Sequence, residues 1–387
     1  MQKLPESETV QINEYYARIS KKLRNIKYLM ILLMVVSLVF ILWAYRNRLT
    51  YDNFRYLLRD MDEAGNTVVS SDSVYYTAND TNNYLFFRGD LAVASSDGVA
   101  LHRALGSRSF EDDVIFKSPS VAGSEKYMIA YDTGGTSFYV YNSISRVYNE
   151  TLERTIADCA AADNGNFAVL TKNNIGGYVI RLYDKNFRLS GEITRERYVY
   201  AVDYFDGERL GIFECVSNGI TLSTDFLIYT VGSEDIDKTV RVPGMVLECG
   251  KTSDGFYLLY DTGLSFFDNS GEKVISYSFG TSGVMYADAY GDAVAVLLDE
   301  NKIGSDCGVY VYTAEKQLYS AHVDSGAKGI ALCGDDSCIL YDGKIVTVND
   351  GEKKETEIPN GGRKIIRQSK ESLIVCYNDY ARIFEVE

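Results

Sequence analysis

Residues 156–194, IADCAAADNGNFAVLTKNNIGGYVIRLYDKNFRLSGEIT, decide the fold of this chain. The segment holds four short runs rich in Ala, Val, Leu, Ile and Tyr, and turns built on Gly, Asp and Asn separate them. Such runs, bounded by turn residues, predict β-strands. Their order is distinctive: an apolar strand, a very apolar strand, a strand of the V-Y-V-Y type, and a last strand after a hairpin. The segment therefore predicts one unit of four strands.

The same layout recurs along the chain. MVLECGKTSDGFYLLYDTGLSFFDNSGEKVISYSF (residues 245–279) and MYADAYGDAVAVLLDENKIGSDCGVYVYTAEKQLYSAHV (residues 285–323) repeat the four strands in the same order. Similar blocks begin near Leu85, Ser118, Ile156, Val199, Val246, Met285, Gly329 and Lys364. A four-stranded unit with a period of roughly 40 residues is typical of a β-propeller. Two β-sandwiches would not produce the repeated order of strand types, so we predict an all-β propeller fold.

The ends of the repeat region predict how the ring closes. Eight block starts predict eight blades, but the last block ends after three strands, at residues 383–387. The surplus strand-like segment Val68–Ala78, VVSSDSVYYTA, precedes the first block and can complete the last blade. Such closure removes sheet edges that would otherwise seed aggregation. We therefore predict an eight-bladed propeller over residues 66–387, with seven blades as the alternative because Leu85–Phe116 is the least regular block.

Ahead of the repeats lies an uncharged apolar run of 18 residues, Tyr28–Tyr45, with the sequence YLMILLMVVSLVFILWAY. As a helix it would extend about 27 Å, close to the thickness of the hydrocarbon core of a bilayer. The run is apolar on all sides, whereas a soluble helix would keep a polar face. We therefore predict a transmembrane helix over residues 28–45 that has the lipid bilayer as its partner, with Trp43 and Tyr45 as membrane-interface anchors.

The flanking segments predict the orientation of this span. Residues 1–27 form a basic head with an apolar helical face, which predicts a juxtamembrane helix; a short coiled coil or a membrane-surface helix is the alternative. Five Lys/Arg in Arg18–Lys27 favour a cytoplasmic N-terminus. Residues 46–65 keep a helical face and predict a stalk. A cleaved signal peptide is disfavoured, because the apolar run is long and no small-residue cleavage site follows it. We predict a single-pass protein of the cytoplasmic membrane with an extracytoplasmic propeller.

Charge and cysteine content limit the function classes. The 387-residue chain carries a net charge of −15, whereas nucleic-acid binding requires clustered Lys and Arg, so we expect no nucleic-acid partner. Seven cysteines are present without C-x-x-C spacing and without the density of a disulfide scaffold. Cys333 and Cys338 flank a short turn, and we give them as a candidate disulfide across a hairpin.

Catalytic and metal-binding motifs are absent from the sequence. Its two histidines, His102 and His322, are not spaced as metal ligands, and no glycine-rich phosphate motif occurs. We therefore assign no catalytic, cofactor-binding or metal-binding residue and expect no cofactor. Four carboxylates near the first strands of successive blades can face the central funnel, and a glycosidase needs only two. They are Asp158, Asp203, Glu248 and Asp288. Aspartates at strand ends also close turns by accepting bonds from backbone amides.

The apolar Tyr28–Tyr45, followed by the D-G turns and V-Y-V-Y strands of Leu85–Val386, resembles an uncharacterised family of single-pass, membrane-anchored β-propeller proteins of Gram-positive anaerobes, the domain of unknown function DUF5711. The resemblance covers most of the chain and implies no known active site. The propeller is also similar to the broader class of quinoprotein-like and outer-membrane-assembly-scaffold propellers. Quinoprotein blades depend on a repeated tryptophan motif, whereas Trp43 is the only Trp of this chain, so quinone chemistry is not implied.

These observations favour a membrane-anchored propeller that binds or scaffolds a partner at the cell envelope. Propellers use the loops of a blade face for function while the blades supply rigidity. The 31 tyrosines can pack in strands and can also furnish contact surface for a protein or glycan partner. The alternative is an envelope carbohydrate-active hydrolase or lyase that uses funnel carboxylates. We do not predict an enzyme.

Overall fold

A computed structural model describes residues 14–44, 73–103, 108–173, 175–233, 235–301 and 303–386. Contacts divide the chain into two compact units, Met1–Val68 and Val69–Glu387. The predicted stalk at residues 46–65 and the predicted anchor residue Tyr45 lie outside the described residues.

The described residues of the first unit form the helix α1, over Glu14–Ala44. Its most apolar part, Ile19–Phe40, has a mean hydropathy of 1.8 and is not buried against any other part of the described chain. By length and composition this helix can cross a membrane, and an N-terminal signal sequence would meet the same criteria. The helix begins well before the predicted span, because the basic juxtamembrane segment continues into it without a break. Trp43 is exposed on α1, with its ring 6.1 Å from that of Phe40.

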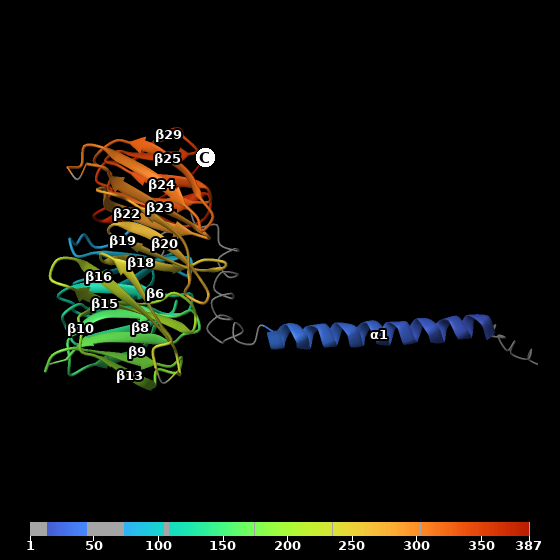
Figure 1. The fold of residues 1–387 in the computed structure, drawn as a ribbon. Helices are drawn as coiled ribbons and strands as arrows, with labels where there is room; N and C mark the ends of the chain where they lie inside the picture. The colour runs from blue at the N-terminus through green and yellow to red at the C-terminus, as the bar shows by residue number, and fades with distance from the viewer. Residues whose placement is uncertain are drawn as a thin grey trace, which may run out of the picture. The chain divides into compact units, whose positions relative to one another are not determined.

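The second unit consists of four-stranded antiparallel sheets that follow one another in chain order (Figure 1). Blade 1 contains β2 (Asn83–Phe87), β3 (Asp90–Ser95), β4 (Gly98–Arg103) and β5 (Arg108–Asp112); blade 2 contains β6 (Pro119–Gly123), β7 (Met128–Asp132), β8 (Ser137–Tyr141) and β9 (Arg146–Thr151). Blade 3 contains β10 (Ile156–Ala161), β11 (Phe167–Lys172), β12 (Tyr178–Tyr183) and β13 (Leu189–Arg195); blade 4 contains β14 (Val199–Tyr204), β15 (Arg209–Ser217), β16 (Leu222–Thr230) and β17 (Lys238–Pro243).

The remaining blades have the same layout. Blade 5 contains β18 (Val246–Lys251), β19 (Gly255–Tyr260), β20 (Gly263–Asp268) and β21 (Lys273–Ser278); blade 6 contains β22 (Gly283–Tyr290), β23 (Ala293–Asp299), β24 (Cys307–Tyr312) and β25 (Gln317–Val323). Blade 7 contains β26 (Gly329–Cys333), β27 (Asp336–Leu340), β28 (Lys344–Asn349) and β29 (Glu352–Glu357); blade 8 contains β30 (Lys364–Arg367), β31 (Ser372–Cys376), β32 (Tyr380–Glu385) and β1 (Ser73–Tyr75). The described chain therefore forms an eight-bladed β-propeller, and the seven-bladed alternative is wrong.

Burial follows the predicted order of strand types. The second strand of each blade is almost completely buried, as in β19, whose residues are all buried. The fourth strand is mostly exposed, as in β29. Eight hydrophobic clusters lie between neighbouring blades, and each combines residues of two blades. Because the side chains of one sheet fill the space against the next, the core is a ring of interfaces between sheets.

The ring closes as the sequence predicts. Within the predicted segment Val68–Ala78, the described residues Ser73–Tyr75 form β1, which pairs antiparallel with β32 and becomes the outermost strand of blade 8. Val74 and Tyr76 are buried in the cluster between blades 8 and 1. The hydroxyl of Tyr76 lies 2.8 Å from the carbonyl oxygen of Tyr377 and 2.7 Å from that of Tyr380. The two ends of the propeller are therefore joined within one sheet.

The strand order also defines the two faces of the propeller. We letter the strands of each blade A to D from the central channel outward. Because successive strands are antiparallel, the loops from B to C and from D to the next A meet on one face, and the loops from A to B and from C to D meet on the other. We call these the BC/DA face and the AB/CD face.

Candidate functional site

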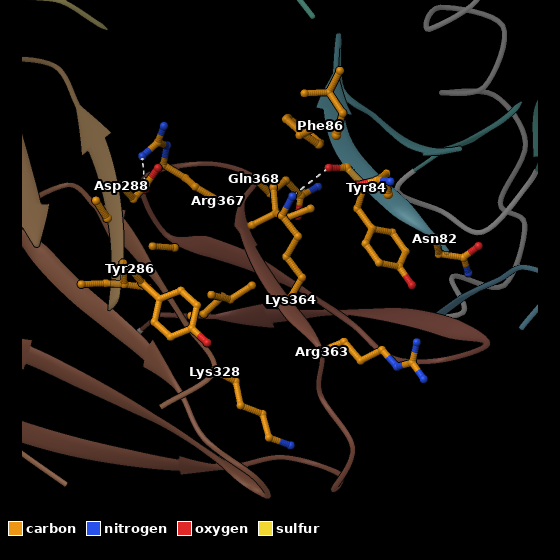
Figure 2. A pocket seen from close by; sticks show the side chains of 18 of the residues that line it. Asn82, Tyr84, Phe86, Tyr286, Asp288, Lys328, Arg363, Lys364, Arg367 and Gln368 are labelled. Atoms are coloured by element: carbon orange, nitrogen blue, oxygen red, sulfur yellow. Dashed lines mark hydrogen bonds and ion pairs between the residues drawn. The ribbon is translucent and has the colours of Figure 1, made fainter. Parts of the chain in front are cut away.

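A cavity of about 800 Å³ lies in the central channel between the A strands β2, β22, β26 and β30 (Figure 2). Loops of the BC/DA face contribute Asp80, Asn82, Lys328 and Arg363 to its wall, so the cavity reaches that face. Its lining is rich in polar groups, which A strands present to the channel because alternate side chains of these strands point away from the sheet interfaces. The cavity is large enough for a small ligand.

Two ion pairs cross this wall. Arg367 on β30 donates to Asp288 on β22 over 2.8 Å (Figure 2). It also donates to the carbonyl of Leu332 on β26 over 2.9 Å. It therefore links three blades. At the mouth, Arg363 is paired with Asp80 at 2.8 Å.

The four predicted funnel carboxylates do lie on the A strands of four successive blades: Asp158 on β10, Asp203 on β14, Glu248 on β18 and Asp288 on β22. Burial raises the pKa of each of them. For Asp203, enclosure by the channel wall and the charge of Asp158 raise the pKa to about 7, although water in the channel reaches the side chain. The charge of Asp288 contributes to the raised pKa of Glu248. The structure thus brings these side chains into one electrostatically connected arc.

Each carboxylate of the arc also has a structural hydrogen bond. Asp158 accepts from the Tyr131 hydroxyl at 2.8 Å and from the Val202 amide of the next blade at 3.0 Å. Glu248 accepts from the Tyr257 hydroxyl at 2.6 Å. The bond from Val202 ties the A strands of blades 3 and 4 together, whereas the bond from Tyr257 lies within blade 5. These bonds hold strands in place and do not close turns. Of the four carboxylates, only Asp288 lines the large cavity.

The raised pKa of Asp203 predicts how the stability of the folded protein depends on pH. Since its pKa is raised to about 7 in the folded protein, the native state binds a proton more tightly than the unfolded chain, and stability falls as pH rises from about 4 to 7. Asp203→Asn removes this loss. We expect the substitution to stabilise the protein at pH 8 by about 1–2 kcal/mol, a value reduced for solvent screening in the channel. Thermal unfolding at pH 5 and pH 8 measures it; an equal effect at both pH values contradicts the assignment.

Cys333 and Cys338 lie on the paired strands β26 and β27 and are buried free thiols in the structure. Cys338 lies opposite Ala331, so the two cysteines are diagonal neighbours. A hydrogen bond with Cys333, together with burial, raises the pKa of Cys338. The disulfide between them stays a prediction. Among the described residues, no group of three or more His, Cys, Asp or Glu side chains is arranged to hold a metal ion.

The most exposed apolar side chains of the described propeller lie on the BC/DA face. Ile115, Ile175, Ile220 and Ile303 each expose between 80 % and 95 % of their surface. All four lie on BC or DA loops, and so does exposed Tyr198. In the described loops of the AB/CD face, large apolar side chains such as those of Ile144 and Phe187 are at least partly covered.

Four exposed apolar side chains of this face belong to blades 3 and 4 or to the loop that joins them. They are Ile175, Tyr198, Ile220 and Leu222, which we call the apolar rim. Ile220 lies at the tip of the hairpin of β15 and β16, whose nine-residue strands are longer than those of the other blades. The ring of Tyr198 packs edge-on against Tyr178, 5.5 Å away. The rim and the cavity mouth therefore lie on the same face.

Sequence reasoning did not single out the rim or the basic side chains of the cavity. A signal for the rim existed: Ile175 precedes Gly176-Gly177, and Ile220 follows Asn218-Gly219. Turns favour Gly, Asn and Asp, so a β-branched isoleucine there is not explained by turn geometry. For Lys364 and Arg367 no local signal exists, because basic residues in strands are common.

The sequence matches a family of unknown function, DUF5711, over residues 64–385. No curated protein matches it in sequence. Among solved structures, the chain is similar to the C-terminal WD40 domain of Sif2 (TM-score 0.57, 11 % identity, 81 % of this chain and 98 % of that one). It is also similar to Saccharomyces cerevisiae Sqt1 (0.57, 10 %, 82 % and 100 %) and to BamB from Moraxella catarrhalis (0.56, 13 %, 82 % and 98 %). At such identities the likeness shows the propeller fold alone.

Proposed function

Because the chain belongs to DUF5711, a family that carries no assigned activity, we propose a function from the geometry of its propeller: a membrane-anchored module that binds a protein partner on the BC/DA face. The observation that carries this proposal is the apolar rim. Exposed single apolar residues are ordinary on protein surfaces, but here the strongly exposed loop residues gather on one face. Burying one isoleucine is worth about 1.5–3 kcal/mol, so a partner that covers the rim gains substantial affinity.

The membrane anchor is the second part of the proposal. The apolar helix α1 supports the anchor by length and composition. The basic residues before the span support an N-terminus on the inside, and with that orientation the propeller would lie on the outer side of the membrane. The enclosed architecture supports a scaffolding role, because a closed ring of sheets holds its face loops rigidly.

We expect the rim to contact the partner in cells. A photo-crosslinking residue placed at position 220 of the full-length chain is expected to give a discrete crosslinked protein, and the same residue at Val274, exposed on the outer strand β21, is not. Adding Ile175→Asp and Leu222→Asp is expected to weaken the crosslink at least about tenfold, because a charged side chain cannot be buried unpaired. The unfolding temperature is expected to change little, because both residues are exposed.

Three results would contradict the proposal. Identical crosslinks from positions 220 and 274 would show that no specific surface exists. A crosslink to glycan or lipid alone would replace the protein partner with another class of ligand. Recovery of the full-length chain in the soluble fraction after alkaline extraction of the membranes would contradict the anchor.

A second candidate function is the carbohydrate-active hydrolase or lyase. Asp203, with its pKa of about 7 beside Asp158, favours it, because a general acid works best when its pKa lies near the working pH. The hydrogen bonds of the arc to neighbouring blades favour a structural role instead. Release of reducing ends from cell-wall polysaccharide, lost in Asp203→Asn, would decide for the enzyme.

A further inference from the structure

We propose that the central cavity is a binding site for a small hydroxylated organic anion, such as a sugar acid. This site is separate from the apolar rim and does not depend on the protein partner. The first observation is charge. Although the chain carries a net charge of −15, the cavity is lined by four cationic and only two anionic side chains. They are Lys328, Arg363, Lys364, Arg367, Asp80 and Asp288.

Lys364 is the cation that a ligand would neutralise. Both carboxylates of the lining are already paired, Asp288 with Arg367 and Asp80 with Arg363. The ammonium of Lys364 instead donates to the backbone carbonyl of Tyr84 over 3.0 Å (Figure 2). No carboxylate in the described part of the chain lies within ion-pair distance of it. An ammonium has three N–H donors, so two directions remain for an oxyanion.

Its surroundings strengthen the case. Protein atoms enclose Lys364 on most sides although water reaches it through the channel, and burial lowers its pKa. An anion bound beside the ammonium would offset this cost, because an opposite charge stabilises the protonated form. Lys328 lies in the loop that precedes β26 and also lines the cavity. Its ion-pair partner is Asp342, which does not line the cavity. The remaining arc carboxylates, Asp158, Asp203 and Glu248, do not line the cavity either.

The second observation concerns hydrogen-bond acceptors. Two buried amide oxygens of the lining, Asn82 Oδ1 and Gln368 Oε1, have no hydrogen-bond partner within the described structure. Buried polar atoms are normally satisfied, and either amide would gain a partner by turning toward the cavity, where a ligand can bring donors of its own. Gln368 follows Arg367 at the far end of β30, whereas Asn82 precedes β2 at the mouth. A ligand with hydroxyl groups along its length and a carboxylate for Lys364 meets both requirements.

The test uses matched small molecules and the full-length protein in detergent. Gluconate combines hydroxyls and a carboxylate, glucose lacks the charge, hexanoate lacks the hydroxyls, and inorganic phosphate is an oxyanion without a carbon chain. Isothermal titration is expected to detect gluconate binding, with glucose and hexanoate at least about tenfold weaker. Binding is expected to weaken with added salt, since screening reduces the attraction between charges.

The variants separate the site from general charge effects. Lys364→Met is expected to weaken gluconate binding about 10- to 100-fold, because a hydrogen bond to a charged group is lost. Lys353→Met, on the exposed strand β29, is expected to change nothing. Lys328→Gln, at the cavity mouth, is expected to weaken gluconate binding as well, and it tests the site if Lys364→Met fails to fold. Gluconate binding that is absent, or unchanged in both cavity variants, would overturn the proposal, and phosphate binding as tight as gluconate would replace the sugar acid with a simple oxyanion.

Discussion

Val74→Asp is expected to lower the free energy of unfolding of the propeller by about 3 kcal/mol, or its Tm by roughly 6–12 °C. Val74 is the central residue of β1 and is only 4 % exposed. An aspartate there places an unpaired charge in the cluster that joins blades 8 and 1. Among the described residues, β1 is the strand from the N-terminal end of the ring that pairs into the C-terminal blade, so the loss acts on closure of the whole propeller.

The matched control is Tyr75→Asp. Tyr75 is the next residue of the same strand, but its side chain points outward and is 68 % exposed. It contacts the ring of Tyr380 at 6.1 Å, so only a small loss of stability is expected. Thermal and urea unfolding of both variants provide the measurement. Equal destabilisation by the two substitutions would contradict the prediction that β1 stabilises ring closure through its buried side chain.

Phe226→Ala is expected to lower the free energy of unfolding by about 3–5 kcal/mol, the usual cost of removing a buried aromatic ring. Phe226, on β16, is completely buried between blades 4 and 5. Its ring centroid lies 5.2 Å from that of Phe213, 5.5 Å from that of Phe205 and 5.7 Å from that of Phe256. Removing it leaves a cavity that these rings cannot fill without moving.

A glycine makes this packing possible. A Cβ on Gly211 would lie 2.3 Å from Cε2 of Phe226, so the ring occupies space that any other residue would need. Phe226→Leu keeps most of the volume and is expected to cost about 1–2 kcal/mol. Unfolding in urea compares the two variants. A loss for Phe226→Ala no larger than that for Phe226→Leu would mean that the interface collapses around the cavity.

The two proposed sites lie on the same face but bind their ligands through different interactions. The apolar rim at Ile175 and Ile220 offers contact area, whereas the cavity beside Lys364 offers charge. Because separate residues carry the two sites, rim variants are expected to leave gluconate binding intact. The anchor, the protein partner and the small anion can therefore be tested independently on one chain.

The fold could be predicted from the sequence because its determinants are local. Each blade is a hairpin series of about 40 residues, so strand order, turn positions and the very apolar second strand are visible in blocks such as residues 156–194. The closure by Val68–Ala78 followed from counting strands, since an incomplete last blade requires one more. The arc of carboxylates followed in the same way, because corresponding positions of successive A strands face one channel.

The tertiary structure alone decided the features that lie between blades, such as ion pairs, open volume and pKa shifts. Arg367 and Asp288 are 79 residues apart in sequence, and only the closed ring brings them within 2.8 Å. The same holds for the cavity, whose walls come from blades 1, 6, 7 and 8. The pKa of Asp203 depends on burial and on a charge from another blade. Repeating local patterns determine the blades and their number, but charge, exposure and open volume depend on how distant blades meet across the channel.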